Sequence, residues 1–320
     1  MKQTPKYPEE FILEFTSIDR FIFRASDVFT LHENTRQEYL DRLDNCHVYF
    51  LTKRPRLSLV PETVQATSDT VSFDVQWSSK GAKQQCTVTV PRDYFNTAEH
   101  SFAVSPYPHR ELISYGADGK AIVHTLLAPA THLFDNLSDE ARDLEVVYIG
   151  KGLRNSARDR LTHHETLQKI LGDISSNDPD AEAFAVVHGF KFRKPVAVFK
   201  GIPAEITGDK LAARRKKAVE YHPSLEEQVS LIEATCISYF QTNKYNTHYL
   251  DFPKRHLRIL RPVYDADFAL LSVQVDHSRV GGQRLYSQKV APASEHLAKI
   301  DFRLLEGKLS LTQRPRSTTD

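Results

Sequence analysis

The stretch VYIGKGLRNSARDRLTHHETLQKIL, residues 147–171, limits the possible folds more than any other, because a strand pattern leads directly into a helix pattern. VYIG is a short apolar run that ends at a glycine. Ser156 followed by Asp159 is a capping-box pattern, which predicts that a helix begins near Ala157. A strand that feeds an amphipathic helix predicts a mixed α/β (α+β) domain.

The core-facing side of this helix carries residues that are unusual for such a position. At about 100° per residue, Arg160 and Leu167 border the core side, whereas Arg158 points to solvent. Burying an unpaired guanidinium is costly, so Arg160 should meet an anion, which is either a structural carboxylate or a ligand. The residues on the core side itself are Ala157, Leu161, His164, Gln168 and Leu171.

A second helix is predicted in SLEEQVSLIEATCISYF, residues 224–240. Ser224 and Glu227 again match a capping box, and Glu233 lies at the edge of the apolar stripe. A carboxylate at that edge can pair with a cation such as Arg160, or it can bind a metal ion whose shell is completed by water. The predicted stripe consists of Leu225, Val229, Ile232, Cys236 and Phe240.

Strand patterns on both sides of these helices predict three regions. Residues 1–125 are β-rich and include a hairpin made of VSFDVQW and CTVTV, and strands at FILEF and HVYFL. Residues 126–255 hold the two helices, the basic helix KLAARRKKAVEY, and strands at THLFD, EVVYIG, AFAVVHGF and PVAVFKG. Residues 256–320 return to strand patterns, LRILRPVY and FALLSVQV, and end in a tail that we expect to be disordered.

Composition narrows the functional classes. The 320 residues are 40% hydrophobic, and no apolar run approaches the roughly 20 residues that a bilayer span requires. Without a secretory core near its start, the chain is expected to be a soluble, cytoplasmic protein with no membrane partner. Three widely spaced cysteines make neither a disulfide framework nor a zinc site. The net charge of +1 means that any nucleic acid must bind to a local patch, and nothing fixes the oligomeric state.

Four motifs occur in one order: YIGKG, then Arg160-x-x-x-His164, then the helical Glu233, then Tyr-Asn at residues 245 and 246. Together they resemble the GIY-YIG nuclease family over about residues 128–250. The resemblance implies a small central sheet with flanking helices and an endonuclease that hydrolyses phosphodiester bonds, here expected in DNA. It also implies one bound Mg²⁺ or Mn²⁺ ion.

The resemblance assigns a role to each matching residue. Tyr148 matches a tyrosine near the attacking water, and Arg160 matches the arginine that steadies the scissile phosphate. His164 matches a histidine one turn further along the helix. Glu233 matches the metal-binding glutamate, and Asn246 matches the asparagine that closes the site.

Further residues are expected to contact the substrate. Gly150 and Gly152 would let the chain leave the strand, which brings Lys151 close to the ligand. Three cations could follow a DNA backbone, although a solvated helix face is the commoner meaning of a basic run. These cations are Arg158, Arg214 and Lys216.

The chain departs from the family pattern where the first signature half, GIY, is expected. The strand directly before EVVYIG reads THLFD and is expected to lie beside it, and neither His132 nor Phe134 supplies the missing tyrosine. Since an imidazole titrates near neutrality, His132 could replace it as a base, or it could have no catalytic part. The alternative function is therefore a nucleic-acid-binding or regulatory module whose nuclease site has decayed.

Overall fold

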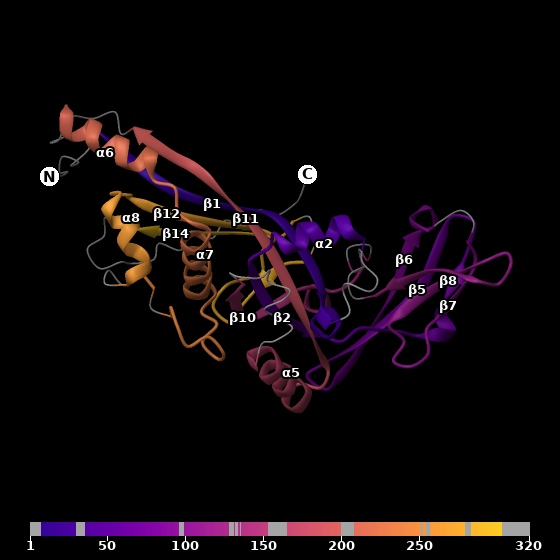
Figure 1. Ribbon diagram of the computed structural model, residues 1–320. Helices are drawn as coiled ribbons and strands as arrows, with labels where there is room; N and C mark the ends of the chain where they lie inside the picture. Colours follow the sequence, from indigo (N-terminus) through magenta and orange to yellow (C-terminus); the bar gives the residue numbers. More distant parts are fainter. Residues whose placement is uncertain are drawn as a thin grey trace.

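The computed structural model describes the chain in eleven stretches, and one large sheet forms its centre (Figure 1). The seven strands run in the order β13-β10-β2-β11-β1-β12-β14, and the sheet is mixed, because β1 pairs in parallel with β12 and β10 with β13. The strands are β1 (Glu9–Arg24), β2 (Val48–Pro55), β10 (Leu144–Lys151), β11 (Ala181–Phe199), β12 (Leu270–Asp276), β13 (Leu285–Tyr286) and β14 (Glu295–Asp301). The described residues are 8–29, 36–95, 99–127, 131, 134, 136–152, 165–199, 208–250, 252–253, 257–278 and 283–302.

Helices cover both faces of this sheet. On one face, α7 packs into the largest apolar core, which it shares with alternate residues of β1, β2 and β10. On the other face, α2 and α5 pack on a second core built around β2 and β11. The helices are α2 (Gln37–Asp44), α3 (Asp139–Arg142), α5 (Glu165–Asn177), α6 (Asp209–Glu220), α7 (Leu225–Phe240) and α8 (Arg261–Asp265), with 3₁₀ turns η1 (Ala25–Phe29), η2 (Pro61–Thr63), η3 (Arg92–Tyr94) and η5 (Arg258–Leu260).

The chain between β2 and β10 forms a separate β-rich unit, which lies at one end of the molecule (Figure 1). Its two small sheets share a core of their own, centred on Phe73, Trp77 and Leu112. The hairpin predicted from VSFDVQW and CTVTV is confirmed as the pair β5–β6. The strands are β3 (Ser58–Leu59), β4 (Gln65–Ala66), β5 (Thr70–Ser79), β6 (Ala82–Pro91), β7 (Glu99–Val104), β8 (Glu111–Gly116) and β9 (Ala121–Leu126).

The mixed α/β class agrees with the prediction, but the large sheet crosses the predicted regions. β1 and β2 come from the first hundred residues, β10 and β11 from the middle, and β12–β14 from the end. The boundaries near residues 125 and 255 therefore assign strands of one sheet to three different regions. The β-rich unit is an insertion between two neighbouring strands.

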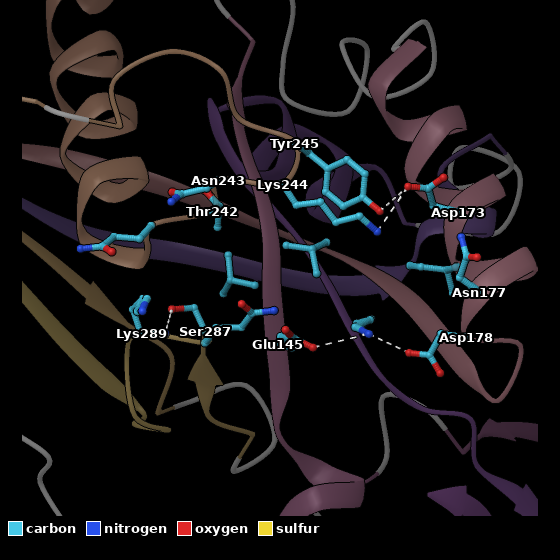
Figure 2. A pocket seen from close by; sticks show the side chains of 16 residues that line it. Glu145, Asp173, Asn177, Asp178, Thr242, Asn243, Lys244, Tyr245, Ser287 and Lys289 are labelled. Carbon is cyan, nitrogen blue, oxygen red and sulfur yellow. Dashed lines mark hydrogen bonds and ion pairs between the residues drawn. The ribbon is translucent and has the colours of Figure 1, made fainter. Parts of the chain in front are cut away.

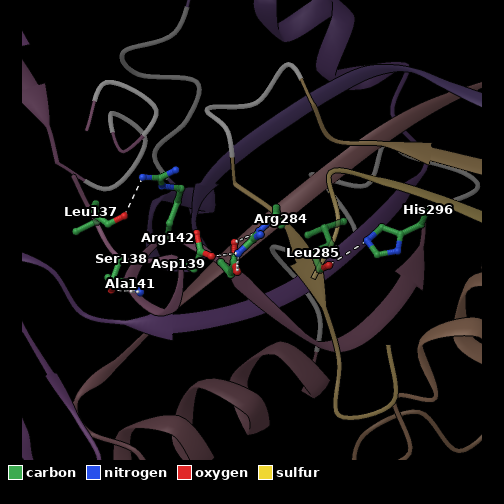
Figure 3. Close-up of polar contacts among 9 residues, drawn as sticks. Leu137, Ser138, Asp139, Ala141, Arg142, Arg284, Leu285 and His296 are labelled. Carbon is green, nitrogen blue, oxygen red and sulfur yellow. Dashed lines mark hydrogen bonds and ion pairs between the residues drawn. The ribbon is translucent and has the colours of Figure 1, made fainter. Parts of the chain in front are cut away.

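Arg284, at the edge of the large sheet, fastens the last residues of the insertion to that sheet (Figure 3). The guanidinium of Arg284 donates to both carboxylate oxygens of Asp143, at 2.9 and 2.7 Å, and lies 2.7 Å from a carboxylate oxygen of Asp139. Asp143 directly precedes β10, and Arg284 directly precedes β13. A two-point arginine–carboxylate contact fixes direction as well as distance, so the start of β10 is held in place.

Two predicted elements differ from those in the structure. LRILRPVY was predicted as a strand, but residues 258–265 form η5 and α8, because Pro262 stands in the first turn of a helix, where no N–H is needed. AFAVVHGF and PVAVFKG were predicted as two strands, yet AFAVVHGF and the residues of PVAVFKG up to Phe199 belong to the single strand β11. No helix among the described residues is long and apolar enough to cross a membrane.

Candidate functional site

The YIG motif lies on β10, and the strand beside it supplies a tyrosine that the sequence reasoning had missed. β10 and β2 are antiparallel, and Tyr49 is the direct partner of Gly150. The rings of Tyr49 and Tyr148 are 6.1 Å apart between centroids, and the side chain of Tyr49 is fully buried. Strand alternation puts Tyr49, Tyr148 and Gly150 on the same face of the sheet, the face covered by α5.

Gly150 is required by the side chain that lies over it. A Cβ atom at this position would stand 2.5 Å from Cζ of Tyr49, closer still to its hydroxyl oxygen, and 2.8 Å from Cε1 of Tyr148. Since carbon atoms normally pack at about 3.5–4 Å, only a residue without a side chain fits here. The glycine of YIG therefore lets the two tyrosines come together.

The predicted strand THLFD is not the partner of EVVYIG. The described neighbours of β10 are β2 and β13, and neither Thr131 nor Phe134 belongs to a strand. Phe134 instead packs against Phe73 in the core of the inserted unit. The expectation that this stretch pairs with β10 is wrong, because an insertion separates two strands that pair. His132 itself lies outside the described residues.

The signal for Tyr49 was present in the sequence. HVYFL was already predicted as a strand, and it contains a tyrosine two positions after its histidine. Only the assumption that paired strands follow one another in the chain concealed that HVYFL lies beside EVVYIG. A strand order with a long insertion between neighbours cannot be read from periodicity.

A lysine at the end of β10 reaches across to helix α7. The ammonium group of Lys151 is 2.9 Å from a carboxylate oxygen of Glu233 and donates to the hydroxyl of Ser230 at 2.9 Å. The side chains of Lys151 and Glu233 are 24% and 12% exposed, so the pair is at the rim of the core and not deep inside it. Glu233 was predicted at the edge of an apolar stripe, and its side chain, although mostly buried, reaches the rim of the core.

Helix α7 starts as predicted but is buried on all sides. Ser224 and Glu227 form a capping box, in which each side chain bonds to the backbone of the other. Every residue from Val229 to Phe240 is buried, because strands of the large sheet and the segment that contains η5 and α8 share one core with the helix. Leu225, predicted in the apolar stripe, is 48% exposed and is therefore outside the core.

The tyrosines and the Lys151–Glu233 pair lie on opposite faces of β10. Ile149 and Lys151 face α7, whereas Tyr148 and Gly150 face the side of α5. Groups from the two faces can meet only beyond the end of the strand, after Lys151. That end is also where the chain continues toward the residues of the predicted Arg-x-x-x-His helix.

Asn246 supports β10 from its open edge. Its side-chain amide donates to the carbonyl of Ile149 at 2.8 Å and accepts from the N–H of Ile149 at 3.0 Å. The hydroxyl of Thr242 donates to the same amide oxygen at 2.7 Å. The amide thus bonds to the backbone of Ile149 as a neighbouring strand would, and Ile149 directly follows Tyr148. Asn246 was expected to close the site, and its contacts among the described residues hold the strand.

Gly152 fixes the chain as it leaves β10. Its N–H donates to the carbonyl of His47 at 2.9 Å, and its own carbonyl lies 3.0 Å from Nδ1 of His47. His47 directly precedes β2, so both strands are tied together at the same end.

The residues expected between β10 and α5 cannot be placed. Arg158, Arg160 and His164 lie outside the described residues, as does the predicted capping box. Within the described part of α5, Leu167 is buried and Gln168 is exposed. The predicted helical face was therefore off by about one position, because the core side is formed by Leu167, Ile170 and Ile174.

One of the predicted DNA-contacting cations is a structural residue. Arg214 is 6% exposed, and its guanidinium contacts the carboxylate of Asp267 at 2.7 Å and the carbonyl of Glu9 at 2.8 Å. It also lies over the ring of Phe11, 5.0 Å from the centroid. Arg214 therefore holds α6 onto β1, which corrects its assignment as a substrate contact. Lys216 is exposed, as a backbone contact would require.

Three buried histidines form a group that the sequence patterns did not single out. His188 and His277 are fully buried, their ring centroids are 5.9 Å apart, and neither ring has a hydrogen-bond partner among the described residues. His296 is 2% exposed and bonds to the hydroxyl of Tyr239 at 3.1 Å. Burial lowers the pKa of His277 to about 3 and that of His296 to about 4, and it lowers the pKa of His188 well below its usual value.

Comparison with known proteins adds nothing to these observations: no family model, curated protein or solved structure matches the chain. The interpretation of the site therefore rests on the residues and contacts described above.

Proposed function

We propose that this protein is a metal-dependent nuclease that hydrolyses phosphodiester bonds in DNA, with the end of β10 as its active site. The observation that carries the proposal is the apposition of β2 and β10, in which Tyr49 lies over Gly150 beside Tyr148. It supports the idea that both halves of a two-tyrosine signature occur in this chain. The halves are separated by the inserted β-rich unit.

The proposed reaction consumes one water molecule. Its oxygen bonds to phosphorus, the bond from phosphorus to the leaving sugar oxygen breaks, and that oxygen takes up a proton. Tyr49 and Tyr148 are proposed to orient the water, and Arg160 to bind the phosphate oxygens with two parallel hydrogen bonds. His164, four residues after Arg160 in the sequence, is proposed to exchange the proton.

Glu233 is the residue proposed to hold the metal ion. No group of three or more histidine, cysteine, aspartate or glutamate side chains close enough to hold a metal occurs in the described ranges. Mg²⁺ and Mn²⁺ nevertheless fit, because such an ion keeps most of its waters and binds through one or two carboxylates together with a substrate phosphate. When bound, it would neutralise phosphate charge and assist the leaving oxygen. Lys151 contacts Glu233 directly, so the lysine must share or release the carboxylate.

A binding module without cleavage activity is the second candidate. The observation that favours it is the arrangement on opposite faces of β10, with Glu233 on the side of α7 and the tyrosines on the side of α5. A carboxylate held by Lys151 and remote from the tyrosines would be a structural ion pair. Such a protein would bind nucleic acid in the same way with and without a divalent metal.

Cleavage assays separate these candidates. The wild-type protein should cut plasmid or single-stranded DNA with Mg²⁺ or Mn²⁺ and should be inactive in EDTA, with RNA as the comparison substrate. Glu233→Gln should abolish cleavage and leave DNA binding nearly intact. The matched control is Glu226→Gln, on the same helix one heptad earlier and exposed, which should cut at the wild-type rate. Equal cleavage by both variants, or cleavage in EDTA, contradicts the proposal.

The two nearby arginines provide a second internal control. Arg160→Ala should lower the cleavage rate at least about a hundredfold, the scale of losing a charge contact in the transition state. Arg158→Ala should have a much smaller effect. The reverse order would assign the phosphate contact to Arg158.

A further inference from the structure

A cavity of about 350 Å³ opens beside β10, just before the tyrosine of the YIG motif (Figure 2). Its walls come from the start of β10, the last turns of α5, the loop after α7 and the turn after β13. This volume is near the lower end of small-molecule sites, so it suits one compact group and not a long chain. The catalytic proposal uses none of its lining side chains.

The charges in this cavity balance. Three lysines and three carboxylates line it, and two of the lysines already have acidic partners. Lys53 lies 2.7 Å from the carboxylate of Asp178 and 3.6 Å from that of Glu145. Lys244 lies 3.4 Å from the carboxylate of Asp173. A site with cancelling charges does not select a bare anion or cation, so its occupant should be a neutral polar group.

The uncharged residues that line the cavity include a tyrosine, a valine and several amide side chains. Tyr245 contributes an aromatic ring whose orientation is set by a 2.8 Å hydrogen bond from its hydroxyl to Asp173 (Figure 2). Val147 supplies part of an apolar floor. Amide side chains each present a donor and an acceptor together, which is the pattern found along the edge of a nucleobase. The lining amides are Asn177, Gln241, Asn243 and Gln288.

The cavity and the candidate active site share one strand. The pairing of β10 with β2 shifts register between Val146 and Tyr148, so Val147 sits in a bulge at the wall of the cavity. Bulges commonly occur next to active sites, where they redirect side chains. From Val147 to Lys151 is four residues, or about 13 Å at about 3.3 Å per residue. At the duplex rise of about 3.4 Å this corresponds to about four nucleotides, and an unstacked strand, which is more extended, spans it with no more than that number.

We propose that this cavity binds one unpaired nucleobase of the substrate strand, within about four nucleotides of the bond that is cut. The proposal rests on the proposed nuclease function for the identity of the polymer, and it specifies the substrate as a strand with an unstacked base. The base packs against Tyr245 and the valine floor, while the amides bond to its edge. Recognition of this kind is typical for looped or single-stranded nucleic acid.

The first test uses deoxynucleoside monophosphates, which need no cleavage. Wild-type protein is titrated with each of the four, and binding is followed by ligand-observed NMR. Tyr245→Leu and Tyr245→Phe both lose the hydrogen bond to Asp173, but only the leucine variant loses the ring. Affinity for the preferred mononucleotide should fall about 5- to 150-fold in the leucine variant and stay near the wild-type value in the phenylalanine variant.

A second variant guards against a folding defect in Tyr245→Leu. The double substitution Asn243→Ala/Gln288→Ala changes two exposed amides and should also weaken mononucleotide binding. Gln84→Ala, an exposed amide on β6 in the inserted unit, is the matched control and should bind as wild type does. If wild type binds no mononucleotide, or if the double variant binds as well as Gln84→Ala, the proposed base site is wrong.

The Glu233→Gln protein separates this inference from the nuclease proposal. It should bind mononucleotides like wild type, whether or not the wild-type protein cuts DNA. Base binding without any cleavage would overturn the nuclease and leave the base site standing. Cleavage that is unchanged when each base near the cut is replaced in turn by an abasic site would overturn the base site alone.

Discussion

Adding a single methyl group at Gly150 tests the packing that brings the two tyrosines together. In Gly150→Ala the new Cβ would stand 2.5 Å from Cζ of Tyr49 and 2.8 Å from Cε1 of Tyr148, where about 3.5–4 Å is normal. Tyr49 is fully buried, so its ring cannot swing into solvent. Overpacking of a closed core costs about 1–3 kcal/mol, and two ring contacts put this case near 3 kcal/mol.

Helix α5 offers a matched control, because a Cβ atom added at Gly172 would have nothing within 4 Å of it. Gly172→Ala should raise the free energy of unfolding by about 0.5–1 kcal/mol, since alanine favours a helix interior over glycine. Urea titrations of both variants give the comparison directly. In a Tyr49→Leu background the penalty of Gly150→Ala should shrink by about 2 kcal/mol, because the ring is gone. If Gly150→Ala is as harmless as Gly172→Ala in the wild-type background, the apposition of Tyr49 and Gly150 is wrong.

Three further predictions concern stability and use the same urea titration. Arg214→Ala should cost about 2–4 kcal/mol, because it leaves buried acceptors unpaired, whereas the exposed Lys216→Ala should change stability by less than about 0.5 kcal/mol. Asn246→Ala should lower the free energy of unfolding by about 2–4 kcal/mol, because the N–H and the carbonyl of Ile149 both lose their hydrogen-bond partner. Asn243→Ala should leave it almost unchanged. The three buried histidines stay neutral when folded but take up protons near pH 6.5 when unfolded. The free energy of unfolding should therefore fall as the pH is lowered from 7 to 5, by about 2 kcal/mol for each histidine. His277→Gln should remove about one third of this pH-dependent loss.

Local patterns predicted the elements whose signals are complete within one hairpin or one helix. The hairpin β5–β6 has strict alternation in both arms, and α7 has a capping box at its start, so both could be predicted. The prediction of a strand at LRILRPVY was wrong, because its apolar residues fit the helical period as well as the strand period. Pro262 favours a helix here, since it lies in the first turn of α8. Within β11, Pro195 lies beyond the part that pairs with β2, so its missing N–H breaks no ladder on that edge.

Long-range pairing explains what the sequence could not predict. Tyr49 and Gly150 are about a hundred residues apart, and nothing in the intervening chain indicates that their strands are neighbours. Arg214 was assigned to a DNA surface because its neighbours are basic, but its acceptors come from Glu9 and Asp267 at distant points of the chain. Glu233 could be placed only in part, because its helix was predicted from periodicity but is buried on all sides by segments that are distant in the sequence.

The central claim is that Tyr49 supplies the first tyrosine of a nuclease site, and the most direct test is the cleavage rate of Tyr49→Phe. This substitution removes one hydroxyl and keeps the ring that packs over Gly150, so the fold should be preserved. The claim predicts that Mg²⁺-dependent cleavage of DNA falls at least about a hundredfold, the scale of misplacing a reacting group such as the attacking water. Tyr94→Phe, on a tyrosine that is 61% exposed in the inserted unit, should cut like wild type. Equal rates for the two variants would contradict the claim.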